Sequence, residues 1–307
     1  MNKIIVMLRS NADEWARLLQ AALPKHSVVT DLEAGRDSLY AVVGKPPPGA
    51  LSQLPALKVV FSVNAGVEAL LESGEVPASI PIVRMVDEGL AEGMLEWVLA
   101  TTLAWHRNLF LYRAAQVAGY WAPQPEALAR DRSLTVLGGG HLGGRAARIL
   151  AQVGFKTTVW SRTPKDIPGV RSLAGLEKLS AAVKGCDMLV NLLPLTPATE
   201  NILDYKLLVQ IAPGGVLINA GRGRHVVDAD VIALLDRGHL RATVLDVFRE
   251  EPLPTTHPFW SHPNVYLTPH VAAPTHPSIA TSAIAENVVA YEASGPLRNV
   301  VDIERGY

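Results

Sequence analysis

The chain has 307 residues, of which 49% are hydrophobic and 19% are charged, and its formal net charge is −1. This composition argues against disorder, and the charge gives no basic surface for nucleic acid. Cys186 is the single cysteine, so no internal disulfide can form and a reducing compartment is expected. The first apolar run, residues 4–8, is too short for a signal peptide, and we expect a soluble, cytoplasmic protein that does not bind a membrane.

The first hundred residues alternate β-branched runs with helical periodicity, the pattern of a parallel sheet covered by helices. The expected strands are Ile4–Leu8, Val28–Leu32, Tyr40–Val43, Val59–Val63 and Ile82–Val86. A helix is expected over Asp13–Leu23, between the first two strands. The apolar, proline-free stretch Glu88–Ala118 predicts one long helix that leaves this unit.

A second alternating series follows a break at residues 120–123. Its expected strands are Leu134–Leu137, Thr157–Trp160, Met188–Leu193, Val216–Asn219, Thr243–Val247 and Val265–Thr268. Helices fit between them, for example over Asp228–Arg237, whereas a last helix at Ser278–Ala293 could return to the first unit. We predict an α/β protein of two doubly wound parallel-sheet domains. Residues 1–100 and 275–307 would form a discontinuous flavodoxin-like substrate domain, and residues 101–274 a Rossmann dinucleotide-binding domain.

A glycine-rich loop joins the first strand of the second series to a helical segment. Gly138, Gly140 and Gly143 have the spacing G-x-G-x-x-G. The first glycine permits a tight turn, the second lets backbone N–H groups approach a pyrophosphate, and the third allows close helix–strand packing. The helix N-terminus would face the anion. This context favours a dinucleotide site over a plain structural turn.

Three polar residues follow successive later strands, where ligands collect in open α/β sheets. They are Arg222, Glu251 and His270. Each alone could be an ordinary loop residue, but together they suit the reduction of a 2-oxo acid. Arginine presents parallel donors to a carboxylate, histidine can deliver a proton near neutral pH, and a carboxylate beside it favours imidazolium. A nicotinamide cofactor would supply the hydride.

Several segments resemble the D-isomer-specific 2-hydroxyacid dehydrogenase family. They are VLGGGHLGG (136–144), NLLPLTPAT (191–199), LINAGRGRHVVD (217–228), LDVFREEPLP (245–254), LTPHVAA (267–273) and SVNAGVE (62–68). Within the family the chain is most similar to the glyoxylate/hydroxypyruvate reductase A type. The segments that support this are WSRTPK (160–165), HVV (225–227) and VDIERGY (301–307).

The resemblance implies roles for individual residues. Arg222 would bind the substrate carboxylate and carbonyl, His270 would be the acid/base, and Glu251 rather than Glu250 would be its partner. The substrate would also contact Asn64, Ala65, Gly66 and, through a partner subunit, Trp121. Cofactor contacts would include His141, Leu142, Leu193, Pro194, Ala220, Gly221 and Asp246. For Asp246, a turn-stabilising carboxylate at a strand end is a close alternative.

Two positions depart from the family pattern. Members usually have glycine where Asn64 stands, and the reductase A type usually has an aromatic residue where Gly44 stands. Two other functions stay open, namely another enzyme such as a D-3-phosphoglycerate dehydrogenase, and a dinucleotide-sensing corepressor. The candidate substrate loop is not noticeably basic, which argues against the phosphorylated substrate.

The cofactor is predicted to be NADPH, with NADH less favoured. An NAD site places an acidic residue about twenty residues past the glycine loop, on the ribose hydroxyl. The chain has Ser161, Arg162 and Thr163 there and no acid, so these side chains would hold the 2′-phosphate.

A homodimer is expected from the apolar 88–118 stretch and the resemblance. The clustered His257, His262, His270 and His276 lie in proline-rich loops, and no metal site is expected.

Overall fold

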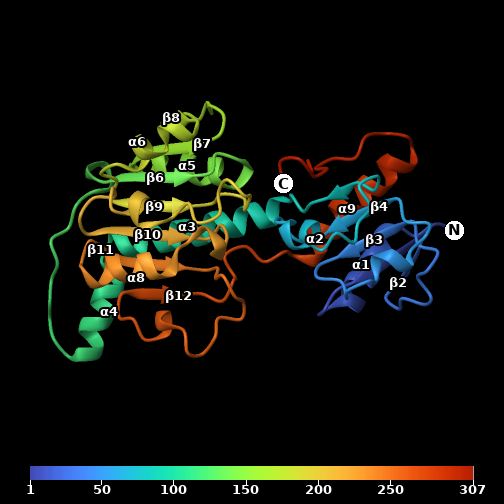
Figure 1. The fold of residues 1–307 in the computed structure, drawn as a ribbon, viewed down its shortest axis with the longest axis horizontal. Coiled ribbons are helices and arrows are strands. Elements are labelled where there is room, and N and C mark those ends of the chain that lie inside the picture. The colour runs from blue at the N-terminus through green and yellow to red at the C-terminus, as the bar shows by residue number, and fades with distance from the viewer. Residues whose placement is uncertain (307) are drawn as a thin grey trace. The chain divides into compact units, whose positions relative to one another are not determined.

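The computed structural model describes residues 1–306, so Tyr307, the last residue of the VDIERGY segment, lies outside the described residues. The chain divides into two compact units, Met1–Leu90 with Pro274–Tyr307 and Ala91–Ala273. Each unit has its own parallel sheet (Figure 1). Over the described part of the chain, no helix is both long enough and apolar enough to cross a membrane.

The first unit contains a five-stranded parallel sheet in the order β2-β1-β3-β4-β5. Its strands are β1 (Lys3–Met7), β2 (Ser27–Val29), β3 (Tyr40–Val43), β4 (Val59–Ser62) and β5 (Ile82–Val83). Its helices are α1 (Ala12–Ala22), α2 (Glu68–Glu72) and α9 (Pro277–Glu292). Because α9 packs against α1, the end of the chain returns to this unit, and the predicted discontinuous flavodoxin-like domain is confirmed.

The second unit contains a seven-stranded parallel sheet in the order β12-β11-β10-β9-β6-β7-β8. Its strands are β6 (Ser133–Leu137), β7 (Lys156–Ser161), β8 (Arg171–Ala174), β9 (Met188–Asn191), β10 (Gly215–Asn219), β11 (Leu240–Leu245) and β12 (Val265–Leu267). Its helices are α4 (Leu109–Ala118), α5 (His141–Val153), α6 (Leu179–Val183), α7 (Tyr205–Leu208) and α8 (Asp228–Asp236), and α3 (Glu88–His106) belongs to it from Ala91 on. The strand order reverses between β6 and β9, as in the predicted Rossmann fold.

Short 3₁₀ helices complete the connections. They are η1 (Leu51–Gln53), η2 (Ala129–Asp131), η3 (Leu176–Lys178), η4 (Gly223–His225) and η5 (Pro258–Trp260).

Several details of the predicted elements are wrong, among them the end of strand β5, which lies at Val83 and not at Val86. The expected helix over residues 88–118 is two helices, α3 (Glu88–His106) and α4 (Leu109–Ala118). Asn108 between them has a left-handed backbone (φ 58°), and its side chain accepts a hydrogen bond from Arg241. Asparagine tolerates this conformation, which ends the first helix. Strand β8 was not expected, and β2 ends at Val29, before the predicted end at Leu32.

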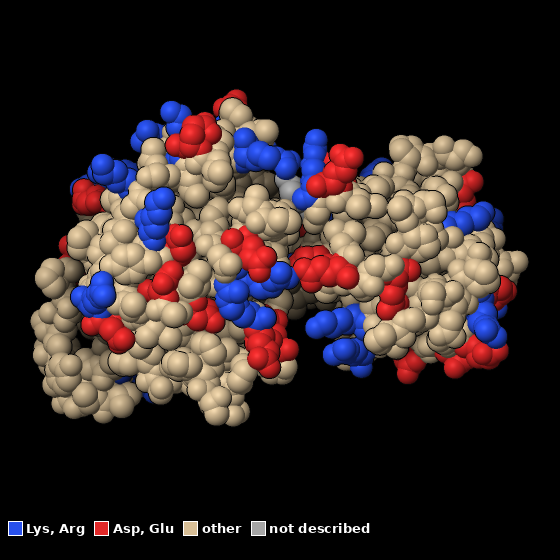
Figure 2. Space-filling model, in the orientation of Figure 1, with Lys and Arg blue, Asp and Glu red and all other residues tan. Residues whose placement is uncertain are grey.

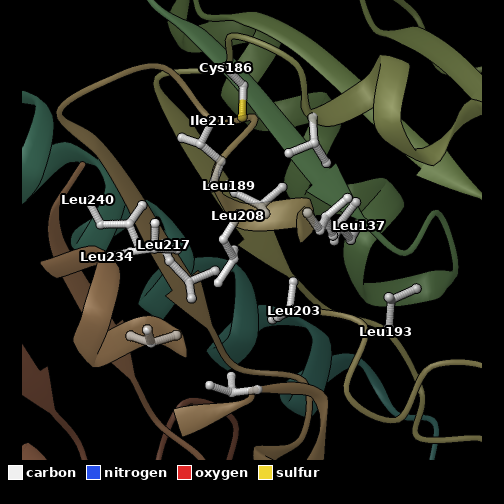
Figure 3. Close-up of a cluster of buried hydrophobic side chains, with 14 of the residues drawn as sticks. Leu137, Cys186, Leu189, Leu193, Leu203, Leu208, Ile211, Leu217, Leu234 and Leu240 are labelled. Atoms are coloured by element: carbon white, nitrogen blue, oxygen red, sulfur yellow. The ribbon is translucent and has the colours of Figure 1, made fainter. Parts of the chain in front are cut away.

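The second unit contains two hydrophobic clusters, and Figure 3 shows side chains of one of them. This cluster contains the lone thiol, Cys186, together with Leu189, Leu208 and Ile211. Burial raises the pKa of the Cys186 thiol to about 12. The cysteine is therefore a packing residue rather than a nucleophile, because only the thiolate is reactive.

The glycine loop brings α5 close to the sheet. Gly138 has φ +104°, and a Cβ on it would lie 2.7 Å from the Leu192 carbonyl oxygen. A Cβ on Gly143 would lie 1.8 Å from the Gly138 carbonyl oxygen. Only glycine fits at both positions, which are the first and third of the motif.

Gly143→Ala should therefore destabilise the protein by about 1–3 kcal/mol, the usual cost of overpacking. Its neighbour provides a matched control, because a Cβ on Gly144 would have only ordinary contacts at 3.6 Å. Gly144→Ala should be neutral or stabilising by up to about 1 kcal/mol, through helix propensity. Urea unfolding of both variants tests this, and equal effects would contradict the close approach.

Candidate active site

The candidate site lies at the carboxyl ends of β10, β11 and β12, where three successive loops leave one edge of the sheet. Arg222 follows β10, Glu251 lies in the loop after β11, and His270 follows β12. The loops are joined through Asp246, whose N–H donates to the Asn219 carbonyl at 3.0 Å and whose carbonyl accepts the His270 N–H at 2.8 Å. The structure therefore brings the three predicted residues to neighbouring loops.

His270 and Glu251 form a hydrogen-bonded pair. His270 Nδ1 lies 2.7 Å from Glu251 Oε2, and Glu251 Oε1 accepts the Phe248 N–H at 2.9 Å. Partial burial alone would raise the pKa of Glu251. The hydrogen bonds from His270 and Phe248, with the positive charge of Arg222, instead hold that pKa below its usual value. An ionised carboxylate can only accept, so Nδ1 of His270 carries a proton and Nε2 faces away from Glu251.

The backbone of His270 has an unusual conformation, with φ +54°. Left-handed backbone is uncommon outside glycine and needs support from its surroundings. The buried Asp246 supplies that support. Its carboxylate accepts the Thr268 hydroxyl at 2.6 Å, the Val271 N–H at 2.9 Å and the Ala272 N–H at 3.0 Å. Asp246 therefore stabilises the loop that carries His270, which agrees with the alternative role of a turn-stabilising carboxylate. Its contact with the cofactor stays a prediction.

The turn that carries Arg222 packs tightly against the loop that carries Glu251. A Cβ on Gly223 would lie 1.8 Å from the Phe248 carbonyl carbon. The Arg222 side chain is half-buried, and its Nη1 donates to the Gly221 carbonyl at 2.7 Å. The glycine after the arginine is thus required by the approach of the two loops, which places Arg222 near Glu251.

A fully buried polar network lies under this turn, and sequence reasoning missed it. Asn191 ends β9 and Asn219 ends β10, and Asn191 Nδ2 donates to Asn219 Oδ1 at 2.8 Å. Asn219 also accepts the Gly221 N–H at 3.1 Å and donates to the Arg222 carbonyl at 3.1 Å. His225 completes the network. Asparagines at two adjacent strand ends were a signal that could have revealed it.

The glycine loop fits a dinucleotide. Space within 4 Å of a Cβ on Gly140 is open, at the N-terminal end of α5 where His141 and Leu142 begin the helix. Backbone N–H groups of a helix's first turn lack partners inside the helix and attract phosphate. Ser161 ends β7, which lies next to β6 in the sheet, and Arg162 and Thr163 follow it. The Ser161 hydroxyl is buried and donates to the Thr163 carbonyl at 2.8 Å, so it supports this segment from inside.

The other predicted substrate residues belong to separate segments. In the first unit, Asn64, Ala65 and Gly66 follow β4 at the carboxyl end of its sheet, and Asn64 accepts the Met85 N–H at 3.1 Å through its carbonyl. Gly44 follows β3 at the same end. In the second unit, Trp121 is 96% exposed after α4. The substrate contacts of these residues stay predictions.

The four clustered histidines do not converge. His257 pairs with Asp228, His262 with Asp236 and His270 with Glu251. His276 lies in the other unit, directly before α9. Among residues 1–306, no group of three or more His, Cys, Asp or Glu side chains could hold a metal ion.

A Rossmann sheet with this glycine loop, and an Arg–Glu–His set at its carboxyl edge, defines a nicotinamide-dependent dehydrogenase. The family model for the D-isomer specific 2-hydroxyacid dehydrogenase NAD binding domain matches residues 99–272. Proteins named glyoxylate/hydroxypyruvate reductase A from Serratia proteamaculans and Yersinia enterocolitica are 41% and 40% identical over the full length of both chains. The chain therefore belongs to the D-isomer-specific 2-hydroxyacid dehydrogenase family, and the resemblance seen in the sequence is confirmed.

Solved structures agree over the whole chain. One is an NADPH-dependent glyoxylate/hydroxypyruvate reductase from Sinorhizobium meliloti in complex with NADP and sulfate, with 38% identity, a TM-score of 0.94 and complete coverage of both chains. Another is a family member from Xanthobacter autotrophicus in complex with NADPH and MES, with 36% identity, a TM-score of 0.94 and coverage of 100% of this chain and 99% of that one.

The lowered pKa of Glu251 predicts a pH-dependent contribution to stability. A carboxyl whose pKa is lower in the folded state stabilises the protein above its unfolded pKa, and the contribution disappears as the pH falls through the folded value. Glu251→Gln should therefore be less stable than wild type at pH 7, with a difference that shrinks below about pH 4.5. Thermal unfolding against pH measures this. Glu250→Gln is the matched control, and the idea fails if both variants give the same profile.

Proposed function

We propose that the protein is an NADPH-dependent reductase of small 2-oxo acids, such as glyoxylate and hydroxypyruvate, to the corresponding 2-hydroxy acids. The observation that carries this proposal is the 2.7 Å pair of His270 and Glu251 beside Arg222, at the carboxyl edge of a dinucleotide-binding sheet. The reductases named among its relatives support the substrate class. A D-3-phosphoglycerate dehydrogenase would need a basic loop for its phosphorylated substrate. A non-enzymic corepressor would show no turnover of glyoxylate.

His270 acts as the proton donor. A ketone that accepts a hydride becomes an alkoxide unless a proton arrives at its oxygen. Nδ1 of His270 is held by Glu251, so Nε2 is the nitrogen that can donate to the substrate oxygen. The ionised Glu251 accepts the Nδ1 proton and fixes the ring plane, which keeps the donor nitrogen oriented.

Arg222 anchors the substrate. Its guanidinium offers paired N–H donors that match a carboxylate, and the same group can polarise the adjacent carbonyl. The buried network under its backbone keeps the turn in place. The ring of His270 would then contact the ketone oxygen of the 2-oxo acid, and the guanidinium of Arg222 would bind its carboxylate.

The cofactor would be held by the glycine loop and by the residues at the ends of β7, β9 and β10. Bound NADPH would supply the hydride. Gly140 and the first turn of α5 would receive the pyrophosphate, and Arg162 would pair with the 2′-phosphate. Leu193, Pro194, Ala220 and Gly221 would contact the nicotinamide half.

His270→Ala should lower kcat for glyoxylate reduction roughly 10²- to 10⁴-fold, the usual loss when a general acid is removed. Steady-state kinetics with saturating NADPH measure it. His262→Ala is the control, because His262 pairs with Asp236 on another part of the same unit and should retain activity. Near-wild-type turnover by His270→Ala would move the donor role to another group.

Arg162→Ala should lower kcat/KM for NADPH roughly 10- to 100-fold and leave the value for NADH nearly unchanged, since a charge-assisted contact to the 2′-phosphate is lost. Arg171→Ala is the matched control, because Arg171 begins the neighbouring strand β8 at the opposite end of the sheet. A wild-type preference for NADH would refute the cofactor assignment.

We further propose that the protein works as a homodimer in the cytoplasm. Large apolar side chains are exposed along α4 and the segment that follows it, namely Leu109 (56%), Val117 (75%), Tyr120 (63%), Trp121 (96%) and Leu128 (55%). Figure 2 shows few charged side chains over this part of the second unit. Exposed apolar groups of this size are typical of interaction surfaces.

Sedimentation at micromolar concentration should therefore give a dimer, and Trp121→Ser should shift it toward monomer. Trp260→Ser serves as the control, because Trp260 is also exposed (57%) but lies on η5. A monomeric wild type would rule out both the dimer and a role of Trp121 in a partner subunit.

A further inference from the structure

His225 is a fully buried imidazole under the Arg222 turn, with partners at both ring nitrogens. Its Nδ1 lies 2.8 Å from Asn191 Nδ2 and 3.2 Å from the Arg222 backbone nitrogen. Its Nε2 lies 3.2 Å from the Pro194 carbonyl oxygen. One ring therefore contacts two segments that are distant in the sequence.

The backbone groups around His225 fix its tautomer. The Arg222 N–H can only donate, so Nδ1 must be an acceptor, and the Pro194 carbonyl can only accept, so Nε2 must carry the proton. The Asn191 amide is fixed in the same way, because its Oδ1 accepts the Leu193 N–H at 3.3 Å. Its Nδ2 is then the group that donates to His225. Every polar atom of the ring has a partner in one neutral form.

The two segments have different proposed roles. Arg222 is the proposed substrate anchor, whereas Leu193 and Pro194 are proposed cofactor contacts. Leu193 also packs in the hydrophobic cluster that Figure 3 shows. We propose that His225 is a positioning residue that holds both segments at once, the Arg222 backbone through Nδ1 and the Pro194 carbonyl through Nε2. This inference rests on the proposed function of those two segments.

The His225 ring is in close contact with the turn that carries Arg222. A Cβ on Gly221 would lie 3.1 Å from His225 Nδ1 and 2.8 Å from Asn191 Nδ2. The turn thus lies directly on the ring and on the asparagine amide. A change at Nε2 acts on the Pro194 carbonyl, whereas a change at Nδ1 acts on the Arg222 N–H and on the Asn191 amide.

We call the hydrogen bond of Nδ1 with the Arg222 backbone and that of Nε2 with the Pro194 carbonyl the two arms of His225. Two substitutions separate them. In His225→Asn, the side-chain oxygen can occupy the place of Nδ1, which keeps the acceptor for Arg222 and loses the donor to Pro194. In His225→Gln, the amide nitrogen can reach the place of Nε2, which keeps the donor to Pro194 and loses the acceptor for Arg222. Each variant removes one arm while it preserves a neutral side chain.

The readouts are two dissociation constants that need no turnover. NADPH binding is followed by its fluorescence, and oxalate, a two-carbon mimic of the oxo acid, is titrated into the enzyme–NADPH complex. His225→Asn should weaken NADPH roughly three- to tenfold, the effect of one lost buried hydrogen bond, with oxalate within about twofold of wild type. His225→Gln should weaken oxalate roughly three- to tenfold, and more than it weakens NADPH, because Gly221 of the same turn is itself a proposed cofactor contact. His262→Gln is the control, because His262 Nδ1 also accepts a backbone N–H, that of Asn264, and both constants should be unchanged.

Equal changes in both constants for both variants, or no change in either, would overturn the proposal and leave His225 a packing residue. Thr199→Val extends the test if the His225 variants do not fold, because the Thr199 hydroxyl is the second donor to the Pro194 carbonyl, at 2.8 Å. It should weaken NADPH alone, and an equal effect on oxalate would count against separate arms. Wild-type turnover of glyoxylate is recorded separately. Its absence would refute the reductase function, whereas the two binding constants would still report on His225.

Discussion

The parallel register of β9, β10, β11 and β12 is the constraint on which the candidate site depends. Because parallel strands end at one edge, each loop begins beside the end of the preceding strand. Backbone hydrogen bonds fix these starting points, from Ala220 to Asn191, from Asp246 to Asn219 and from Thr268 to Leu245. Arg222, Glu251 and His270 lie shortly after these strand ends, which leaves the proposed catalytic side chains little freedom.

The loop after β12 shows how much support the proposed proton donor, His270, receives from its surroundings. His270 has a left-handed backbone, which costs free energy for a residue with a Cβ. Asp246 offsets that cost with three accepted hydrogen bonds to Thr268, Val271 and Ala272, and it is 1% exposed. The unusual backbone conformation and the hydrogen bonds that stabilise it therefore occur at His270, the residue proposed to donate the proton. A relaxed loop would point the imidazole elsewhere and would separate it from Glu251.

Much of this arrangement could be predicted from the sequence. Strand runs such as Tyr40–Val43 and Val216–Asn219 have a buried, β-branched character that local composition reveals, and the residues after them follow from sheet geometry. Strand β8 was missed because RSLA is short, half-polar and at the sheet edge. The helix break at Asn108 was missed because it depends on a left-handed backbone and on Arg241, a contact distant in the sequence.

The buried network was missed for a related reason. Asn191 and Asn219 each end a strand, which is a local signal, but their pairing with each other and with His225 follows only once β9 and β10 are known to be adjacent. The HVV segment was noticed as a mark of resemblance, whereas the role of its histidine depends on partners on two other segments. Periodicity identifies elements, but it cannot identify the hydrogen bonds between their ends.

The site also separates charged groups from neutral ones. The network under the Arg222 turn is neutral and fully buried, with two amides and one imidazole. Its members satisfy one another, so burial carries no penalty for an uncompensated charge. The groups proposed to bind and protonate the substrate, Arg222, Glu251 and His270, remain partly exposed above it. This order follows from electrostatics, because groups that carry charge are stable where water reaches them, whereas the buried groups that hold them in place are most stable without charge. A protonated His225 would lose its acceptor for the Arg222 N–H, so the neutral form of that ring is part of the architecture that positions the charged residues.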